Sequence, residues 1–190
     1  TAFGNNEADL NARIDDSIEN LKKLIPKYIF GYEKDRIEEV VGQLLKEKGS
    51  SLSLAESCTG GNIAHLITGV SGSSNYFKGS VVAYSNDIKQ QVLNVDPKSI
   101  QQNGAVSKQV VEQMATGVRN SFKSDYAIAT SGVAGPTGGT KQKPVGTVWI
   151  AVAYNEGVVS KRFNFGNNRE RNIQISSLSA LNMLRLVLLN

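Results

Sequence analysis

The chain has 190 residues, 40% of them hydrophobic and 20% charged, which is enough for one good core with a small appended piece. Its net charge of +4 suits an anionic ligand but indicates no nucleic acid partner, because no basic run with interleaved aromatic residues occurs. A single cysteine and a single histidine exclude a disulfide framework and a zinc site of the usual Cys/His ligand count.

No apolar run approaches the length of a membrane span, and the N-terminus does not read as a signal peptide. We therefore expect a cytoplasmic protein with no membrane partner. The first residue is Thr1 and not methionine, which is consistent with a fragment of a longer protein.

The N-terminal stretch predicts a helix and a short strand. Apolar residues within 8–25 recur at spacings of three and four, which indicates an amphipathic helix ended by Pro26. Residues 28–30 form a strand-like run closed by Gly31. This helix–strand extension carries little apolar content, so we assign residues 1–32 to the tail of a preceding domain or an N-terminal arm, and residues 33–190 to the main domain.

Beyond residue 33, segments with a helical period alternate with short apolar runs typical of strands. Strands are expected at 52–56, 80–85, 126–131, 145–154 and 158–165. Helices are expected from a capping box formed by Asp35 and Glu38, after Gly60-Gly61, at 86–93, at 97–102, from an N-cap at Ser107 to Phe122, and after residues 166–168. This order predicts an α/β fold, a layered α/β/α domain with a mixed sheet, closed by a hairpin around residues 155–157.

Two glycine-rich loops, SCTGG (57–61) and SGVAGPTGG (131–139), follow predicted strands. Ligands of open α/β sheets collect at the carboxyl ends of strands, so we expect the two loops to form a phosphate-and-ribose cradle. The first loop also opens a helix, where free backbone N–H groups and the helix dipole favour an anion. Neither loop has the Walker A or the GxGxxG pattern.

The hydroxyl-rich turns supply the candidate nucleophiles Ser57, Ser73, Ser74 and Ser131. A serine needs a base, and the only histidine, His65, is expected to be a helix-surface or packing residue. Lys89 and Tyr84 are the alternative, since Tyr84 ends a predicted strand and Lys89 lies about one turn into the next helix. Either burial lowers the Lys89 pKa by roughly 3 units, so that its amine is the base, or Lys89 stays charged and Tyr84 relays the proton.

Further candidates surround both loops. Glu56 can polarise a nucleophile or bind a ribose, whereas Cys58 has no partner placed for it and is expected to be a small buried residue. A guanidinium at the start of the last helix, Arg169 or Arg171, can clamp a phosphate. The remaining binding candidates are Thr59, Gly60, Gly61, Thr130, Ser131, Gly132, Gly135 and Thr137.

Several long motifs, in order, resemble those of one family: AESCTGG (55–61), YFKGSVVAYSNDIK (76–89), GAVS (104–107), SGVAGPTGG (131–139) and KPVGTVWIA (143–151). Over roughly residues 35–190 the chain resembles the C-terminal domain of the CinA family, which is a nicotinamide mononucleotide (NMN) deamidase. Residues 1–32 resemble the end of the linker domain that precedes it in full-length CinA.

The resemblance implies hydrolysis of the NMN carboxamide to nicotinate mononucleotide and ammonia, with no metal or cofactor, in a homodimer. Its Ser, Tyr and Lys groups map onto Ser57 or Ser74, Tyr84 and Lys89; we place Ser74 as the nucleophile and Ser57 in the anion or oxyanion site. The family's Gly-Asp-Arg before the last helix appears here as Gly-Asn-Asn-Arg (166–169), altered and one residue longer, so both arginines stay candidates. The alternative function is a nucleotide-binding regulatory module without amidase activity.

Overall fold

The structure is a computed structural model that describes residues 2–25, 28–32 and 34–190. The chain divides into two compact units between Asp35 and Arg36, and each is described by itself. Within the described residues, no helix combines the length and apolar character needed to cross a membrane.

The first unit contains helix α1 (Glu7–Leu24), which confirms the predicted N-terminal helix. The side-chain oxygen of Asn6 caps it by accepting from the backbone N–H of Ala8 at 3.0 Å. The predicted strand at 28–30 is wrong, because these residues form no strand. Pro26, the predicted helix stop, lies outside the described residues.

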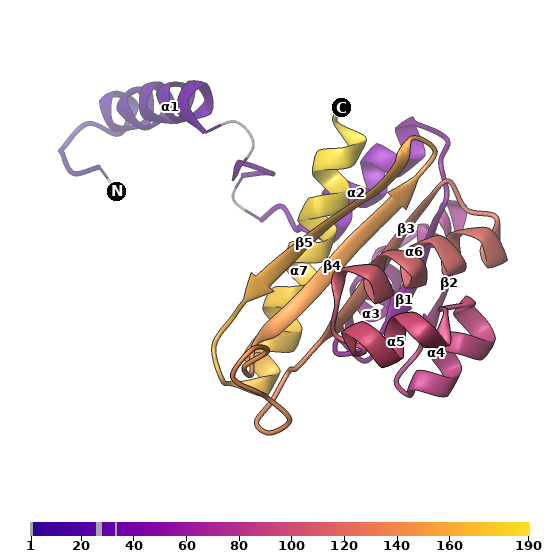
Figure 1. Ribbon diagram of the computed structural model, residues 1–190. Helices are drawn as coiled ribbons and strands as arrows, with labels where there is room; N and C mark the ends of the chain where they lie inside the picture. Colours follow the sequence, from indigo (N-terminus) through magenta and orange to yellow (C-terminus); the bar gives the residue numbers. More distant parts are fainter. Residues whose placement is uncertain (1, 26–27, 33) are drawn as a thin grey trace. The chain divides into compact units, whose positions relative to one another are not determined.

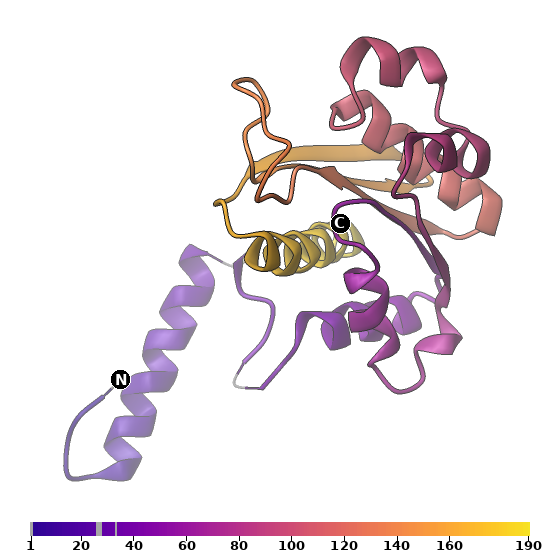
Figure 2. The ribbon, with the colours of Figure 1, turned by 90° about the horizontal axis from the view of Figure 1, so that it is seen from below.

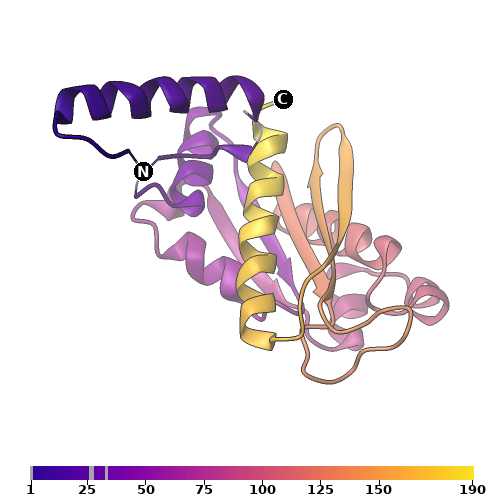
Figure 3. The same cartoon turned by 90° about the vertical axis from the view of Figure 1, so that its left-hand side faces the viewer.

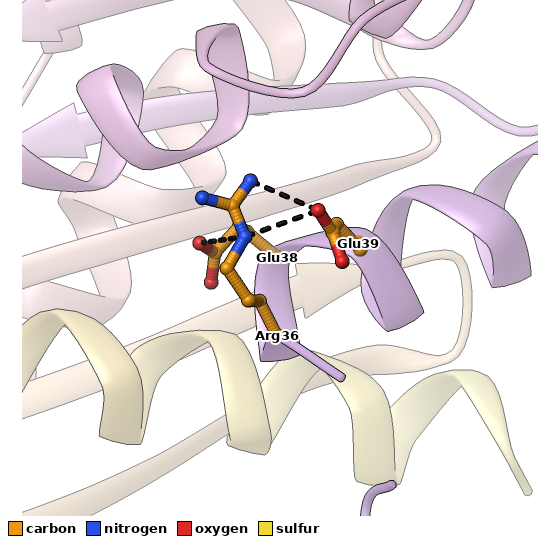
Figure 4. Close-up of polar contacts among 3 residues, drawn as sticks. All are labelled: Arg36, Glu38 and Glu39. Atoms are coloured by element: carbon orange, nitrogen blue, oxygen red, sulfur yellow. Dashed lines mark hydrogen bonds and ion pairs between the residues drawn. The ribbon is translucent and has the colours of Figure 1, made fainter. Parts of the chain in front are cut away.

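The second unit begins with helix α2 (Ile37–Glu47), whose start differs from the prediction. The Asp35 carboxylate accepts from the backbone N–H of Tyr32 at 2.8 Å, so it is not available as the N-cap. Arg36 takes that position without a side-chain cap. Its guanidinium instead pairs with two first-turn acids, Glu38 at 3.4 Å and Glu39 at 3.0 Å (Figure 4). The predicted capping box is therefore wrong.

A five-stranded mixed sheet forms the centre of this unit, in the order β2-β1-β3-β4-β5. β1 is parallel to both β2 and β3, and β4 is antiparallel to β3 and β5. The strands are β1 (Leu52–Glu56), β2 (Phe77–Val82), β3 (Tyr126–Gly132), β4 (Thr147–Tyr154) and β5 (Gly157–Asn164). The predicted strand at 80–85 thus lies too late, and Tyr84 falls in the connection after β2.

Helices cover both faces of the sheet (Figures 1 and 2). Besides α2 they are α3 (Asn62–Thr68), α4 (Asn86–Leu93), α5 (Pro97–Asn103), α6 (Lys108–Phe122) and α7 (Arg169–Leu188), with a short 3₁₀ turn at Ser73–Asn75. α7 runs along one face against β3, β4, α2 and α3 (Figure 3), while α6 packs on the other against β1, β3 and β4. This is the predicted α/β/α architecture with a mixed sheet.

The two faces of the sheet carry side chains of different size. Ile128 and Ile150 join the buried cluster beneath α2, α3 and α7. Their neighbours on the opposite face, Ala129 and Ala151, join the cluster beneath α6. Strand side chains alternate between the two faces of the sheet. The small residues on the α6 face therefore let this helix pack close to β3 and β4.

The parallel strands β1, β2 and β3 place their carboxyl ends at one edge of the sheet. The turn after β1, the connection after β2 and the glycine-rich loop after β3 therefore meet there. This edge is where the sequence places its candidate ligand site.

Candidate active site

Ser57 follows the last residue of β1, and Lys89 lies one turn into α4. The Lys89 ammonium donates to the Ser57 hydroxyl at 3.2 Å. The backbone N–H of Ser57 donates to the carbonyl of Thr130 on the adjacent strand, which holds the serine against the sheet. A half-buried hydroxyl and an amine thus meet within hydrogen-bond reach, the geometry that a serine nucleophile and its base require.

The Lys89 side chain is almost fully enclosed, with only 1% of its surface exposed. Its nitrogen donates to the carbonyl of Ala83 at 2.7 Å and to that of Tyr84 at 3.4 Å. Burial lowers the pKa of the amine below its ordinary value of 10.5, because an ammonium is costly to remove from water. The direction of this shift is the one that a lysine base requires.

The same contacts suit the neutral amine. A neutral amine has two N–H donors and one lone pair, and Lys89 faces two carbonyl acceptors and one hydroxyl. When the proton leaves Lys89, the Ser57 hydroxyl can reverse its role and donate to the amine. The site therefore satisfies both protonation states of Lys89 without rearranging its backbone acceptors.

A cavity of about 250 Å³ opens beside these two residues. Its charged lining groups are cationic, Lys89 and Arg169, and no Asp or Glu lines it within the described residues. Burial raises the pKa of the Cys58 thiol to about 12, so the lone cysteine faces the cavity as a neutral group. The lining residues are Ser57, Cys58, Tyr84, Asn86, Lys89, Ala105, Val106, Ser131, Gly132, Ala134 and Arg169.

Arg169 bridges the mouth of this cavity. Its guanidinium donates to the Tyr84 hydroxyl at 3.1 Å and to the Gly135 carbonyl at 2.8 Å. Tyr84 is 62% exposed, and its hydroxyl is the group that contacts Arg169. A cation and a phenol therefore lie together in the cavity lining.

Comparison with known proteins identifies the family of the chain. A sequence profile of the CinA C-terminal domain matches residues 34–188. The chain belongs to the CinA family.

Relatives of similar sequence carry the same family name. A CinA-like protein of Cytophaga hutchinsonii is 44% identical over 185 residues, covering 97% of this chain and 44% of the relative. A CinA-like protein of Thermosipho melanesiensis is 47% identical over 179 residues, covering 93% of this chain and 44% of the relative. The chain therefore spans less than half the length of the curated relatives that it matches.

Solved CinA structures share the fold. A CinA superfamily protein from Klebsiella pneumoniae superimposes with a TM-score of 0.77 at 32% identity, over 81% of this chain and 98% of its own. A competence/damage-inducible protein from Agrobacterium tumefaciens gives a TM-score of 0.77 at 34% identity, over 84% of this chain and 99% of its own.

The anion site predicted at the first glycine-rich turn of this CinA domain is already occupied. The buried Glu56 carboxylate accepts from the backbone N–H groups of Gly61 and Ile63, each at 3.1 Å, and of Ala64 at 2.8 Å. The chain's own carboxylate thus fills the N-terminus of α3 that was expected to receive a phosphate. Glu56 is a helix cap here and does not line the cavity.

Other predicted binding residues of the loops serve the structure. The Thr59 and Thr130 hydroxyls share a buried hydrogen bond at 2.8 Å, which joins the turn after β1 to β3. Gly60 and Gly61 have φ values of +62° and +97° and turn the chain into α3. None of these four residues is among those that line the cavity, and their assignment as ligand contacts stays a prediction.

The structure does not bring Ser74, the predicted nucleophile, into the cavity that Ser57 and Lys89 line. Ser74 is exposed in the 3₁₀ turn that precedes β2, whereas Ser57 follows β1, which runs parallel to β2. The two serines therefore lie at opposite ends of the parallel strands, and Ser57 alone of the two lines the cavity with Lys89.

Of the two arginines, Arg169 lines the cavity, whereas Arg171 lies two residues further into α7 with an exposed side chain. The Ser131 hydroxyl lines the cavity and donates to the carbonyl of Ala105 at 2.7 Å. Gly132 lines it as well, and the Gly135 carbonyl holds Arg169.

Sequence reasoning missed Asn172, a buried residue of α7. Its amide nitrogen donates to the carbonyl of Ala134 at 2.9 Å and to that of Gly166 at 2.8 Å. It thereby ties the loop after β3 to the turn that presents Arg169. Its position one turn into the helix behind a Gly-Asn-Asn turn was the only signal in the sequence. Asn86, Ala105 and Val106 also line the cavity, and the YSN and GAVS motifs contain them.

Proposed function

We propose that this CinA domain hydrolyses the carboxamide of NMN to nicotinate mononucleotide and ammonia. The observation that carries the proposal is the Lys89 amine, buried and lowered in pKa, at 3.2 Å from the Ser57 hydroxyl. A buried lysine that contacts a serine hydroxyl at the edge of a cavity has the geometry of a base beside its nucleophile.

In the first half of the reaction, the neutral Lys89 amine takes the hydroxyl proton of Ser57 while the serine oxygen attacks the carboxamide carbon. The oxyanion that forms needs backbone N–H donors. Those of Cys58 and Thr59 directly follow the nucleophile, and neither takes part in the described backbone–backbone hydrogen bonds. The C–N bond then breaks, and ammonia leaves with the proton that Lys89 received.

In the second half, water attacks the ester carbon of the acylated Ser57, and Lys89 again accepts the proton. The C–O bond to the serine breaks, and the Ser57 hydroxyl regains its proton from Lys89. The carboxylic acid that forms loses its remaining proton to solvent and leaves as the carboxylate, nicotinate mononucleotide. Both halves use the Lys89 nitrogen as the base and the Ser57 oxygen as the acyl carrier, so the site needs only one base.

Arg169 is the cationic group suited to the substrate phosphate. Its guanidinium lines the cavity at the mouth, and it is anchored to the Gly135 carbonyl and the Tyr84 hydroxyl. A planar guanidinium pairs with phosphate through two parallel hydrogen bonds. The N-terminus of α3 cannot do this, because Glu56 fills it.

The test is ammonia release from NMN by the purified chain and by Ser57→Ala, with Ser74→Ala as the matched control. We expect the loss of Ser57 to lower kcat by about 10³-fold or more, as for other nucleophiles of this kind, while binding of NMN persists. Ser74→Ala should leave turnover unchanged. Release that survives in Ser57→Ala would refute the assigned nucleophile. Binding without any release by the wild type would support a regulatory nucleotide-binding module instead.

A further inference from the structure

Among the residues that the structure describes, no anionic group lines the cavity beside the Lys89 amine. The turn after β1 offers the Ser57 hydroxyl and the neutral Cys58 thiol, the connection after β2 offers carbonyls and the Tyr84 phenol, and α7 offers the Arg169 guanidinium. β3 and the link before α6 contribute no titratable group to the cavity lining. The protonation of this amine is therefore open to control by whatever charge enters the cavity.

Two carboxylates lie close to the site in sequence, Glu56 and Asp87, and neither lines the cavity. Glu56 accepts from the backbone N–H groups of Gly61, Ile63 and Ala64 at the start of α3, and its side chain is not part of the cavity lining. Asp87, in the first turn of α4 itself, is exposed to solvent. A cation that binds beside Lys89 thus meets no fixed countercharge in the lining.

Resting on the proposed function, we propose that the site selects carboxamides of positively charged, N-substituted pyridinium rings, because the ring charge drives the proton off Lys89 and leaves its amine as the base. On binding, the Lys89 N–H bond breaks and the proton passes to solvent. The amine then accepts the Ser57 proton during attack. The substrate in this way switches on the base that acts on it.

The distances in the site set how far the pyridinium charge can lower the Lys89 pKa. Attack requires the carboxamide carbon within roughly 3–3.5 Å of the Ser57 oxygen, and that oxygen lies 3.2 Å from the Lys89 nitrogen. The ring nitrogen, separated from the carboxamide carbon by two ring carbons, then lies no more than about 10 Å from the amine. At an effective dielectric constant of about 20, two unit charges at that separation shift a protonation equilibrium by about one pKa unit, and by more at shorter distances.

The ring is also compatible with the rest of the site. The exposed Tyr84 can receive a pyridinium cation through the π-electrons of its ring. The substrate phosphate, at the far side of the ribose, can pair with Arg169, so its charge is neutralised locally and does not cancel the ring charge at Lys89.

A binding experiment tests this with the non-hydrolysing Ser57→Ala variant. NMN is compared with its neutral-ring isostere, a benzamide C-riboside 5′-phosphate, by calorimetry in two buffers of different protonation enthalpy. We expect NMN to release up to one proton more than the isostere at a pH between the bound and free pKa values of Lys89. The phosphate is common to both ligands and its protons subtract out. Lys89→Met in the same background should abolish the difference.

Wild-type kinetics give a second readout that does not depend on any variant folding. The acid limb of kcat for NMN should lie about one pH unit or more below that of kcat/KM, because these report the bound and the free enzyme respectively. For the isostere the two limbs should coincide. The isostere is intrinsically less reactive than NMN by a factor that does not depend on pH. The ratio of kcat for NMN to kcat for the isostere should therefore fall about 10-fold or more as the pH rises.

The outcomes separate the two proposals. Equal proton release by the two ligands, or coincident limbs for NMN, overturns the selection by ring charge while the amidase assignment stands. Failure of NMN to bind at all overturns both.

Discussion

At the scale of single residues, Lys89 combines a chemical task with an energetic cost. Because burial lowers its pKa below 10.5, the unfolded chain binds more protons than the folded one between the lowered value and 10.5. The folded state therefore gains stability from this residue as the pH rises through that window, and it carries the full penalty below it.

Lys89→Met removes this titration. We expect the stability of the wild type to rise relative to the variant as the pH increases towards 10.5, and the variant to release no ammonia from NMN. Urea denaturation of both proteins at several pH values measures the difference. A difference in unfolding free energy that is constant across this range would show that Lys89 keeps its ordinary pKa in the folded state.

Arg169 and Arg171 form a matched pair for testing the phosphate contact. Arg169→Ala should raise KM for NMN by about 10- to 100-fold, the worth of a charge-assisted bidentate contact of about 1.5–3 kcal/mol. Arg171→Ala should change it little, because this residue is not part of the cavity lining. Steady-state kinetics of the two variants measure these changes in KM. A larger increase in KM for Arg171→Ala than for Arg169→Ala would show that Arg169 is not the phosphate-binding residue.

Residue types and motifs in the sequence were enough to bring Ser57, Tyr84 and Lys89 into consideration, but not to choose between Ser57 and Ser74. That choice depends on which end of a strand each serine occupies. Both serines stand in hydroxyl-rich turns of similar composition, and the difference appears only when β1 and β2 are paired in parallel. The composition of a turn does not show at which end of the parallel strands the turn lies.

At the scale of elements, helix starts were the least predictable feature. The Asp35–Glu38 capping box failed because the Asp35 carboxylate bonds to the upstream Tyr32 amide, and the anion site of α3 failed because Glu56 reaches it from the preceding strand. In both cases a side chain from a neighbouring turn decides which backbone donors remain free. The caps at Ser107 and Asn6, where no such neighbour competes, follow ordinary preferences.

The Glu56 cap can be tested directly. Glu56→Gln replaces one acceptor oxygen by an NH₂ group and leaves at least one of the three buried backbone donors of α3 without a partner. We expect a loss of about 1–3 kcal/mol in unfolding free energy, which lowers Tm by several degrees. Glu156→Gln, in the exposed hairpin turn, should cost less than about 0.5 kcal/mol. Equal effects of the two substitutions in thermal melts would contradict the capping role.

At the scale of the whole molecule, both buried clusters of the structure fall within residues 36–190, and α1 contains no buried residue. The candidate site lies within the same unit. The order of strands and helices in this unit was predictable from hydrophobic period and turn signals, whereas the sheet order required the pairing itself.

A truncated chain of residues 36–190 should fold on its own with the same Tm as the full chain, to within a few degrees, and with the same kcat on NMN. Two solved CinA proteins support this expectation, because 98–99% of their own length superimposes on only 81–84% of this chain. Circular dichroism melts and the ammonia assay measure it. Loss of cooperativity in the truncated protein would show that the first unit contributes to the core.

The unequal faces of the central sheet have a consequence for sequence variation. At Ile128 and Ile150 an exchange for another aliphatic residue alters only the interdigitation of flexible side chains. At Ala129 and Ala151 a larger group needs room from α6, which packs so closely against its other neighbour that a methyl group at Gly117 would lie 1.9 Å from the Leu93 carbonyl oxygen. A saturation library at these four positions should therefore accept other aliphatic residues at Ile128 and Ile150 and retain only small residues at Ala129 and Ala151.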